Sequence, residues 1–155
     1  DFYVALSKEY PLISLEDPMH EEGFQDMAEL TAKVGDRMQL VGDDLFVTNP
    51  QRLRKGIDMK AGNSMLLKVN QIGTVSEAMR AAEICFDSGY NVMVSHRSGE
   101  SEDTTMADIA VALECGQIKS GAPARTERTA KYNRLLRIEE NLGSKAKFIG
   151  REAFH

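Results

Sequence analysis

Apolar residues in the chain follow two alternating patterns: short unbroken runs, and longer stretches in which every third or fourth residue is apolar. Short apolar runs that include β-branched residues and end in polar residues or glycine are typical of buried strands. Five runs of this kind predict strands, at Leu12–Leu15, Met38–Val41, Met65–Gly73, Asn91–Ser95 and Gln117–Ser120.

The stretches between these runs have the spacing of amphipathic helices and carry helix start signals. Asn49 and Pro50 form a helix start with proline at the first position, and Thr74–Glu77 is a capping box. We therefore expect helices at Asp1–Glu9, Glu22–Val34, Asn49 to about Ile57, Thr74 to Gly89, Asp103 onwards, and about Thr126–Asn141, the last with Tyr132, Leu135 and Leu136 facing inward.

Strand and helix alternate along the chain, which is typical of a parallel sheet covered by helices. The polar residues that end the strands follow one another at intervals of 27, 25, 28 and 23 residues, at Glu16, Asp43, Lys68, His96 and Lys119. One βα unit of a TIM barrel takes about 30 residues, and functional side chains in that fold lie where strands end. The spacing therefore predicts an α/β fold with one active-site rim.

Five βα units are too few to close an eight-stranded barrel. Either the sheet is open and doubly wound, or the chain is a segment of a longer protein. The chain starts on Asp1 rather than on an initiator methionine, which favours the segment. No linker or low-complexity segment divides the sequence, so we expect a single domain over residues 1–155.

Composition narrows the class of protein without identifying a function. The 155 residues are 42% apolar and 28% charged, which is ordinary for a soluble globular domain. The net charge of −5 argues against a nucleic-acid partner, because no basic block is present to neutralise phosphates. No apolar run approaches the roughly 18 residues of a membrane span, and no signal peptide is visible. Cys85 and Cys115 form no Cys-x-x-Cys pair, which favours reduced thiols in a cytoplasmic protein.

Lys68 stands inside a run that otherwise has the character of a core strand. Lysine is among the residues least often fully buried unless it is paired, so its position calls for a reason. One interpretation is that the strand has ended and the side chain reaches water. The other is that Lys68 lies in a polar cavity, where desolvation or a second cation favours the neutral amine and lets it act as a base.

Two pairs of acidic residues end the first two predicted strands, Glu16 with Asp17 and Asp43 with Asp44. Neighbouring carboxylates repel unless a proton or a cation lies between them, and hard oxygen ligands with open positions suit Mg²⁺. Strand alternation lets only one member of each pair point to the rim, and the pattern does not choose between them. The alternative interpretation is that these carboxylates cap the helices that follow.

The segment Ser95–Gly99 follows the fourth predicted strand and contains a histidine, an arginine and two serines. This combination suits a binding site for an oxyanion or phosphate. It offers an arginine fork, a hydroxyl and a glycine that permits close backbone approach. Lys119, at the end of the fifth strand, is suited to neutralise a carboxylate and to repel the charge on Lys68.

Five motifs, in order along the chain, resemble those of the enolase family. They are Ser14–Pro18, Val41–Leu45 with Thr48–Pro50, Leu66–Thr74, Ser95–Glu100 and Gly116–Arg125. Together they cover nearly the whole chain, which makes the resemblance specific. It implies that residues 1–155 are the C-terminal part of an enolase-type barrel domain, a TIM-type (β/α) barrel segment of about five βα units. These units are strands four to eight of the barrel; the N-terminal capping domain and the first strands lie outside the sequence.

The resemblance implies a role for each residue at the metal and the base. Glu16 and Asp43 match two Mg²⁺ ligands, which also contact the substrate, in preference to Asp17 and Asp44. Lys68 matches the base that takes the proton from C2 of 2-phosphoglycerate.

The resemblance also implies how the substrate is bound by the last two strand ends. Arg97 and Ser98 match the phosphate contacts, and Ser95 and His96 belong to the same substrate loop. Lys119 matches the lysine that meets the carboxylate end of the substrate.

The complete protein is then expected to be a Mg²⁺-dependent glycolytic lyase that reversibly dehydrates 2-phosphoglycerate to phosphoenolpyruvate. It would be a cytoplasmic enzyme with a small-molecule substrate and would form a homo-oligomer. Residues 1–155 alone are expected to be inactive, because a third metal carboxylate and the acid that helps hydroxide leave lie outside them.

Two alternative functions remain open. One is another member of the enolase superfamily acting on a carboxylate without phosphate, which the segment His96–Ser98 argues against. The other is a non-catalytic enolase fragment, or an enolase surface that binds other proteins.

Overall fold

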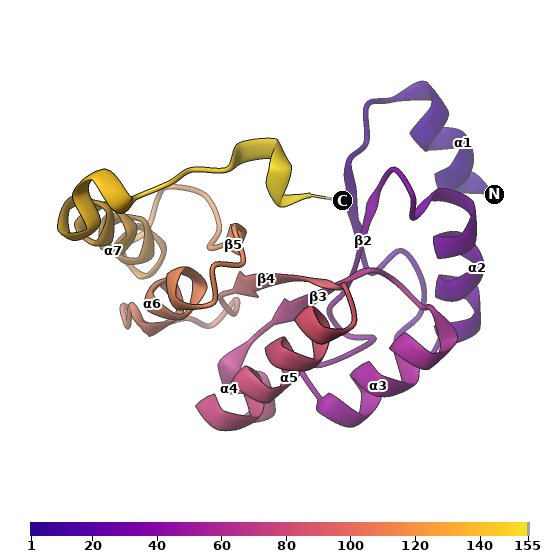
Figure 1. Ribbon diagram of the computed structural model, residues 1–155, viewed down its shortest axis with the longest axis horizontal. Coiled ribbons are helices and arrows are strands. Elements are labelled where there is room, and N and C mark those ends of the chain that lie inside the picture. Colours follow the sequence, from indigo (N-terminus) through magenta and orange to yellow (C-terminus); the bar gives the residue numbers. More distant parts are fainter. Residues whose placement is uncertain (155) are drawn as a thin grey trace. The chain divides into compact units, whose positions relative to one another are not determined.

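Strands and helices alternate along residues 1–154, the part of the chain that the computed structural model describes (Figure 1). The strands are β1 (Ser14–Glu16), β2 (Gln39–Gly42), β3 (Ser64–Leu67), β4 (Asn91–Ser95) and β5 (Ile118–Lys119). The helices are α1 (Phe2–Glu9), α2 (Phe24–Val34), α3 (Pro50–Met59), α4 (Val69–Ile72), α5 (Val75–Asp87), α6 (Thr105–Ala112) and α7 (Thr126–Leu142), with short 3₁₀ helices η1 (Gly143–Lys145) and η2 (Gly150–Ala153).

The strands follow the order β1-β2-β3-β4-β5 in the sheet, which is also their order along the chain. The β1–β2, β2–β3 and β4–β5 pairs are parallel, with Glu16 opposite Val41, Gly42 opposite Met65, and Ser95 opposite Lys119. Parallel neighbours joined by helices are the repeated βα unit, so the predicted α/β class is confirmed.

The chain divides into two compact units, Asp1–Val92 with Phe154, and Met93–Ala153. In the first unit, every residue of β2 and β3 is buried, so these strands are covered on both faces. Helices α2, α3 and α5 lie side by side against the strands (Figure 1). Burial on both faces explains why the strands read as unbroken apolar runs rather than as alternating patterns.

Phe46 is the centre of packing in the first unit, and two glycines make room for it. Its side chain is fully buried, with the rings of Phe24 and Tyr90 each 6.5 Å away between centroids. A Cβ placed on Gly42 would lie 2.5 Å from the Phe46 ring, and one placed on Gly56 would lie 2.4 Å from it. The ring is therefore held between the end of β2 and the middle of α3.

In the second unit, α6 packs against α7 (Figure 1). Arg134 of α7 forms a forked ion pair with Asp108 of α6, which lowers the pKa of that carboxyl from its ordinary value. Lys131, also on α7, is fully buried. The buried amide of Gln117, next to β5, donates to the carbonyl oxygen of Ala153 at 2.6 Å.

Two sequence predictions about local structure are wrong. The strand predicted over Met65–Gly73 ends at Leu67, and the remaining residues form α4, which closes at Gly73 with a φ of 113°. Leu136 is 63% exposed rather than facing inward. It follows Leu135 directly, and consecutive helical residues point about 100° apart, so one contact face does not bury both.

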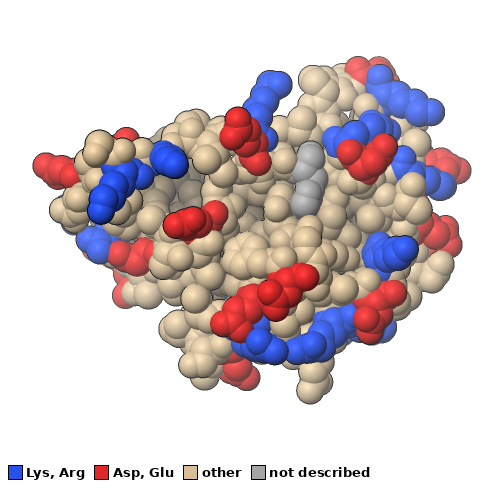
Figure 2. Space-filling model, in the orientation of Figure 1, with Lys and Arg blue, Asp and Glu red and all other residues tan. Residues whose placement is uncertain are grey.

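No helix among residues 1–154 is long and apolar enough to cross a membrane. Figure 2 shows Lys and Arg side chains interspersed with Asp and Glu side chains over the face that it draws.

Candidate metal and substrate site

The candidate site in the first unit is built on the ends of β2 and β3. Asp43 follows β2 directly, and Lys68 follows β3 and begins α4. The Lys68 Nζ lies 2.6 Å from Asp43 Oδ2, and the two side chains are only 14% and 11% exposed. The Lys68 amine is therefore held at a largely buried carboxylate rather than extended into water.

The second carboxylate oxygen of Asp43, Oδ1, is buried and has no hydrogen-bond partner among residues 1–154. A buried carboxylate oxygen without a partner is unfavourable, because its hydration is lost and nothing replaces it. A divalent cation bound by carboxylate oxygens would supply the missing interaction. Asp43 Oδ1 is therefore a candidate metal ligand, because a bound cation would replace the hydration that the oxygen loses on burial.

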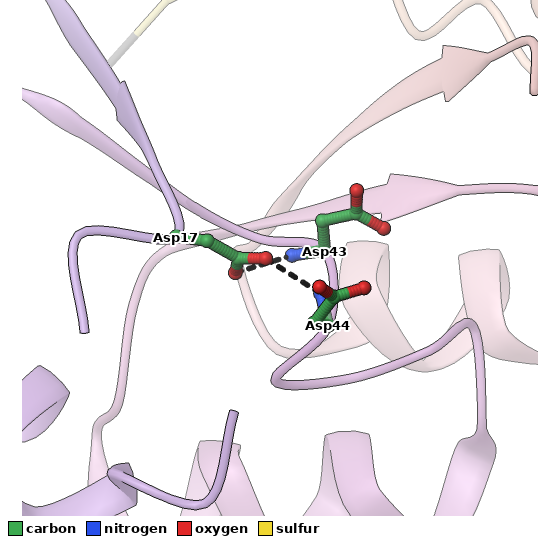
Figure 3. A group of neighbouring side chains, drawn as sticks. All are labelled: Asp17, Asp43 and Asp44. Carbon is green, nitrogen blue, oxygen red and sulfur yellow. Dashed lines mark hydrogen bonds between the residues drawn. The ribbon is translucent and has the colours of Figure 1, made fainter. Parts of the chain in front are cut away.

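Asp17 lies next to Asp43 and binds the backbone of the loop that carries it. Asp17 Oδ1 accepts the backbone N–H of Asp43 at 2.9 Å, and Oδ2 accepts that of Asp44 at 2.7 Å. Figure 3 shows the Asp17 carboxylate pointing at these two N–H groups, whereas the Asp43 carboxylate points away from it. Burial raises the pKa of Asp17, and the two backbone hydrogen bonds oppose that rise.

Carboxylate oxygens of Asp17, Asp43 and Asp44 lie within 4.8 Å of one another. Both oxygens of Asp17 already accept a hydrogen bond, so its visible role is to fix the start of the β2–α3 loop. Glu16, the exposed last residue of β1, precedes Asp17 in the chain. Its role as a metal ligand stays a prediction. The positioning role of Asp17 was missed because its partners are backbone groups of the loop after β2.

The loop from Asp43 to Thr48 also holds the backbone of Lys68. The hydroxyl of Thr48 accepts the Lys68 backbone N–H at 2.9 Å. Sequence reasoning placed Thr48 in a family motif but missed this contact, since the partner is a backbone group 20 residues along the chain.

In the second unit, the candidate site residues gather at the ends of β4 and β5. Ser95 is opposite Lys119 in the strand register, and the backbone N–H of His96 donates to the Lys119 carbonyl at 3.0 Å. The Ser95 hydroxyl is buried and donates to the His96 carbonyl at 2.9 Å. The structure therefore brings these three predicted residues together.

His96 is held in a setting that favours its neutral form. Burial lowers the pKa of His96, repulsion from Arg128, Lys119 and Lys131 lowers it further, and attraction to Glu100 opposes the shift. The Nδ1 atom is buried without a hydrogen-bond partner in the part of the chain that the structure describes. An imidazole nitrogen of this kind is available to a polar ligand.

Arg97 and Ser98 lie on the loop between β4 and α6, and the backbone of that loop is clamped at two points. The Glu100 carboxylate accepts the backbone N–H of Arg97 at 3.0 Å and that of Ser101 at 3.3 Å. The buried ammonium of Lys131 donates to the Ser101 carbonyl and, at 2.6 Å, to the Glu127 carbonyl. Sequence reasoning missed Lys131; the available signal was a lysine four residues before Leu135 on the predicted inner face of α7.

Comparison with known proteins gives a consistent result over the whole chain. The family model for the C-terminal TIM barrel domain of enolase matches residues 1–155. An enolase from Methanopyrus kandleri is 62% identical over 154 residues, which is 99% of this chain and 36% of that protein. An enolase from Bifidobacterium animalis subsp. lactis is also 62% identical over the same shares. One from Methanocaldococcus jannaschii is 64% identical over 151 residues, 97% of this chain and 35% of that protein.

The chain thus spans little more than a third of the length of the relatives it matches. These matches confirm the resemblance read from the five motifs, and they confirm the TIM-barrel fold class.

Proposed function

The chain belongs to the enolase family, and we propose that it is the C-terminal barrel part of an enzyme that interconverts 2-phosphoglycerate and phosphoenolpyruvate with Mg²⁺. On this proposal the complete protein is a cytoplasmic glycolytic lyase. The observation that carries the proposal is the largely buried Lys68–Asp43 pair at adjacent strand ends, with one Asp43 oxygen left without a partner among the described residues.

Asp43 and Glu16 are the residues that would hold the metal ion. Both offer carboxylate oxygens, which Mg²⁺ prefers, and Asp43 Oδ1 is buried and unpartnered within residues 1–154. Bound Mg²⁺ supplies a positive charge that stabilises the negative charge developing on the substrate carboxylate when the neighbouring carbon loses its proton.

Lys68 is the proposed base for that proton. In its unprotonated form, Nζ accepts the proton from C2 of 2-phosphoglycerate, the C2–H bond breaks, and the electron pair passes to the substrate carboxylate. The ammonium so formed lies 2.6 Å from Asp43 Oδ2, which stabilises it in a site with little water. A lysine base beside Mg²⁺ is the known pattern of the enolase superfamily.

The residues of the second unit are proposed to bind the substrate. Arg97 and Ser98 would bind the phosphate, since a guanidinium fork matches phosphate oxygens in pairs. Glu100 supports this role by holding the Arg97 backbone N–H at 3.0 Å. Ser95 and His96 would contact the substrate from the same loop, and Lys119 would meet its carboxylate end.

The test is the exchange of the C2 hydrogen of 2-phosphoglycerate with solvent deuterium, catalysed by the complete enzyme. Lys68→Ala should slow exchange by about 10²–10⁴-fold, the typical contribution of a general base. Lys147→Ala, which removes an exposed lysine, is the matched control and should exchange at the wild-type rate. Wild-type exchange by the Lys68→Ala enzyme would overturn the assignment of the base.

A further inference from the structure

Two consecutive β-branched residues in the β2–α3 loop adopt left-handed backbone conformations. Val47 has a φ of 45° and Thr48 a φ of 56°. A positive φ is a genuine outlier for a β-branched residue, and it persists only where surrounding contacts over-determine it. Outliers of this kind cluster at functional sites, so the contacts that hold Thr48 in place are informative.

Thr48 is fully buried, and its hydroxyl is directed at the end of β3. Oγ1 accepts the Lys68 backbone N–H at 2.9 Å and has two acceptors within reach for its own proton. These are the Leu66 carbonyl at 3.3 Å and Gln71 Oε1 at 3.4 Å. One hydroxyl therefore bridges the end of β3, the Lys68 backbone and α4.

The Lys68 N–H lies beyond the last paired residues of β2 and β3, Gly42 and Met65. Thr48 supplies a side-chain acceptor at this point, where the register of the two strands ends. The same loop supplies Asp43, whose carboxylate holds the far end of the Lys68 side chain at 2.6 Å. The segment 43–48 therefore contacts Lys68 at two points, the backbone N–H and the side-chain Nζ.

We propose that Thr48 is a positioning residue for Lys68, and that the left-handed backbone at Val47 and Thr48 is what places the hydroxyl on the Lys68 N–H. The inference rests on the proposed role of Lys68 as the base. A base must be held within hydrogen-bond reach of the proton it removes, and small misplacements slow the reaction strongly. Thr48 contributes to proton removal through Lys68 and does not touch the substrate.

The test compares Thr48→Ser with Thr48→Ala in the complete enzyme. Both variants remove the branched methyl group, and they differ by the single oxygen that binds Lys68. Thr48→Ser should exchange the C2 hydrogen within about threefold of wild type, and Thr48→Ala about 10–100-fold more slowly, the size expected for a displaced catalytic group. The dissociation constant of 2-phosphoglycerate, measured by calorimetry, should stay within about twofold in both, because Thr48 acts on the base and not on substrate binding.

Thr48→Val is the second variant, since it keeps the shape and the branch and loses only the hydroxyl. It should match Thr48→Ala in exchange. The inference would be overturned if Thr48→Ser and Thr48→Ala exchanged the C2 hydrogen at the same rate. It would also be overturned if a variant lost substrate affinity by the same factor as it lost exchange rate. Failure of both Thr48→Ala and Thr48→Val to fold would also overturn it, because Thr48 would then be a general structural requirement. Lys68→Ala separates the two proposals. Exchange at the wild-type rate by Lys68→Ala would overturn the proposed base. If Lys68→Ala is inactive but the Thr48 variants exchange at the wild-type rate, only the positioning role of Thr48 is overturned.

Discussion

Gly56→Ala tests whether packing at Phe46 outweighs helix propensity. Gly56 lies in the interior of α3 and is buried. In an exposed helix, alanine in place of glycine stabilises by roughly 0.5–1 kcal/mol, because glycine loses more backbone entropy on folding. Here the added Cβ would lie 2.4 Å from Cε1 of Phe46, which is closer than atoms in contact approach.

The direction of the net effect depends on whether the Phe46 ring has room to move. A shift away from Gly56 would press the ring against Gly42. There is little space on that side, because even a Cβ added to Gly42 would lie only 2.5 Å from the ring. The Phe24 and Tyr90 rings are further neighbours, each 6.5 Å away between centroids. Forcing one extra carbon into such a core typically costs about 1–3 kcal/mol, which exceeds the gain in propensity. We expect Gly56→Ala to lower the free energy of unfolding by about 1–2 kcal/mol.

Urea unfolding of the complete protein, followed by circular dichroism, measures this difference. Asp58→Ala is the matched control, because it raises helix propensity at an exposed position of the same helix; its stability should be unchanged or slightly higher. Phe46 is also hydrogen-bonded to the backbone of Asp43, so Gly56→Ala should weaken Mg²⁺ binding as well. A Gly56→Ala protein as stable as wild type would show that the ring relaxes freely and would refute the packing argument.

Three further predictions follow from the two sites and the core. Asp17→Asn replaces one acceptor of a backbone N–H by a donor, so Mg²⁺ binding, measured by calorimetry, should weaken about 10–100-fold; unchanged affinity would contradict the positioning role. Arg97→Lys should weaken binding of 2-phosphoglycerate and of inorganic phosphate, because the bidentate fork is lost; if neither affinity changes, the loop is not the phosphate seat. Burial raises the pKa of Cys85 from 9.0 and of Tyr90 from 10.0, both to about 12. The unfolded chain loses these protons first, so the urea midpoint should fall as pH rises from about 9 to about 12, and the fall should be smaller in Cys85→Ala.

The order of strands and helices could be predicted from the sequence because it depends on patterns that repeat within a few residues. The strand Asn91–Ser95 was predicted with the bounds that the structure shows, and the Thr74 capping box begins α5 as expected. Helix caps and apolar runs report local backbone conformation and burial directly. The five motifs then identified the family, since each contains the polar residues at or just after the end of a strand.

The tertiary structure alone decided which of those polar residues meet, and how. The sequence placed Asp43 and Lys68 at strand ends, but their 2.6 Å contact depends on the parallel register of β2 and β3. The partners of Asp17 and Thr48 are backbone groups about 20–26 residues away, and backbone groups carry no mark in a sequence. Contacts of this kind are chosen by strand register and by the path of a loop, so they become visible only when the folded chain brings distant segments together.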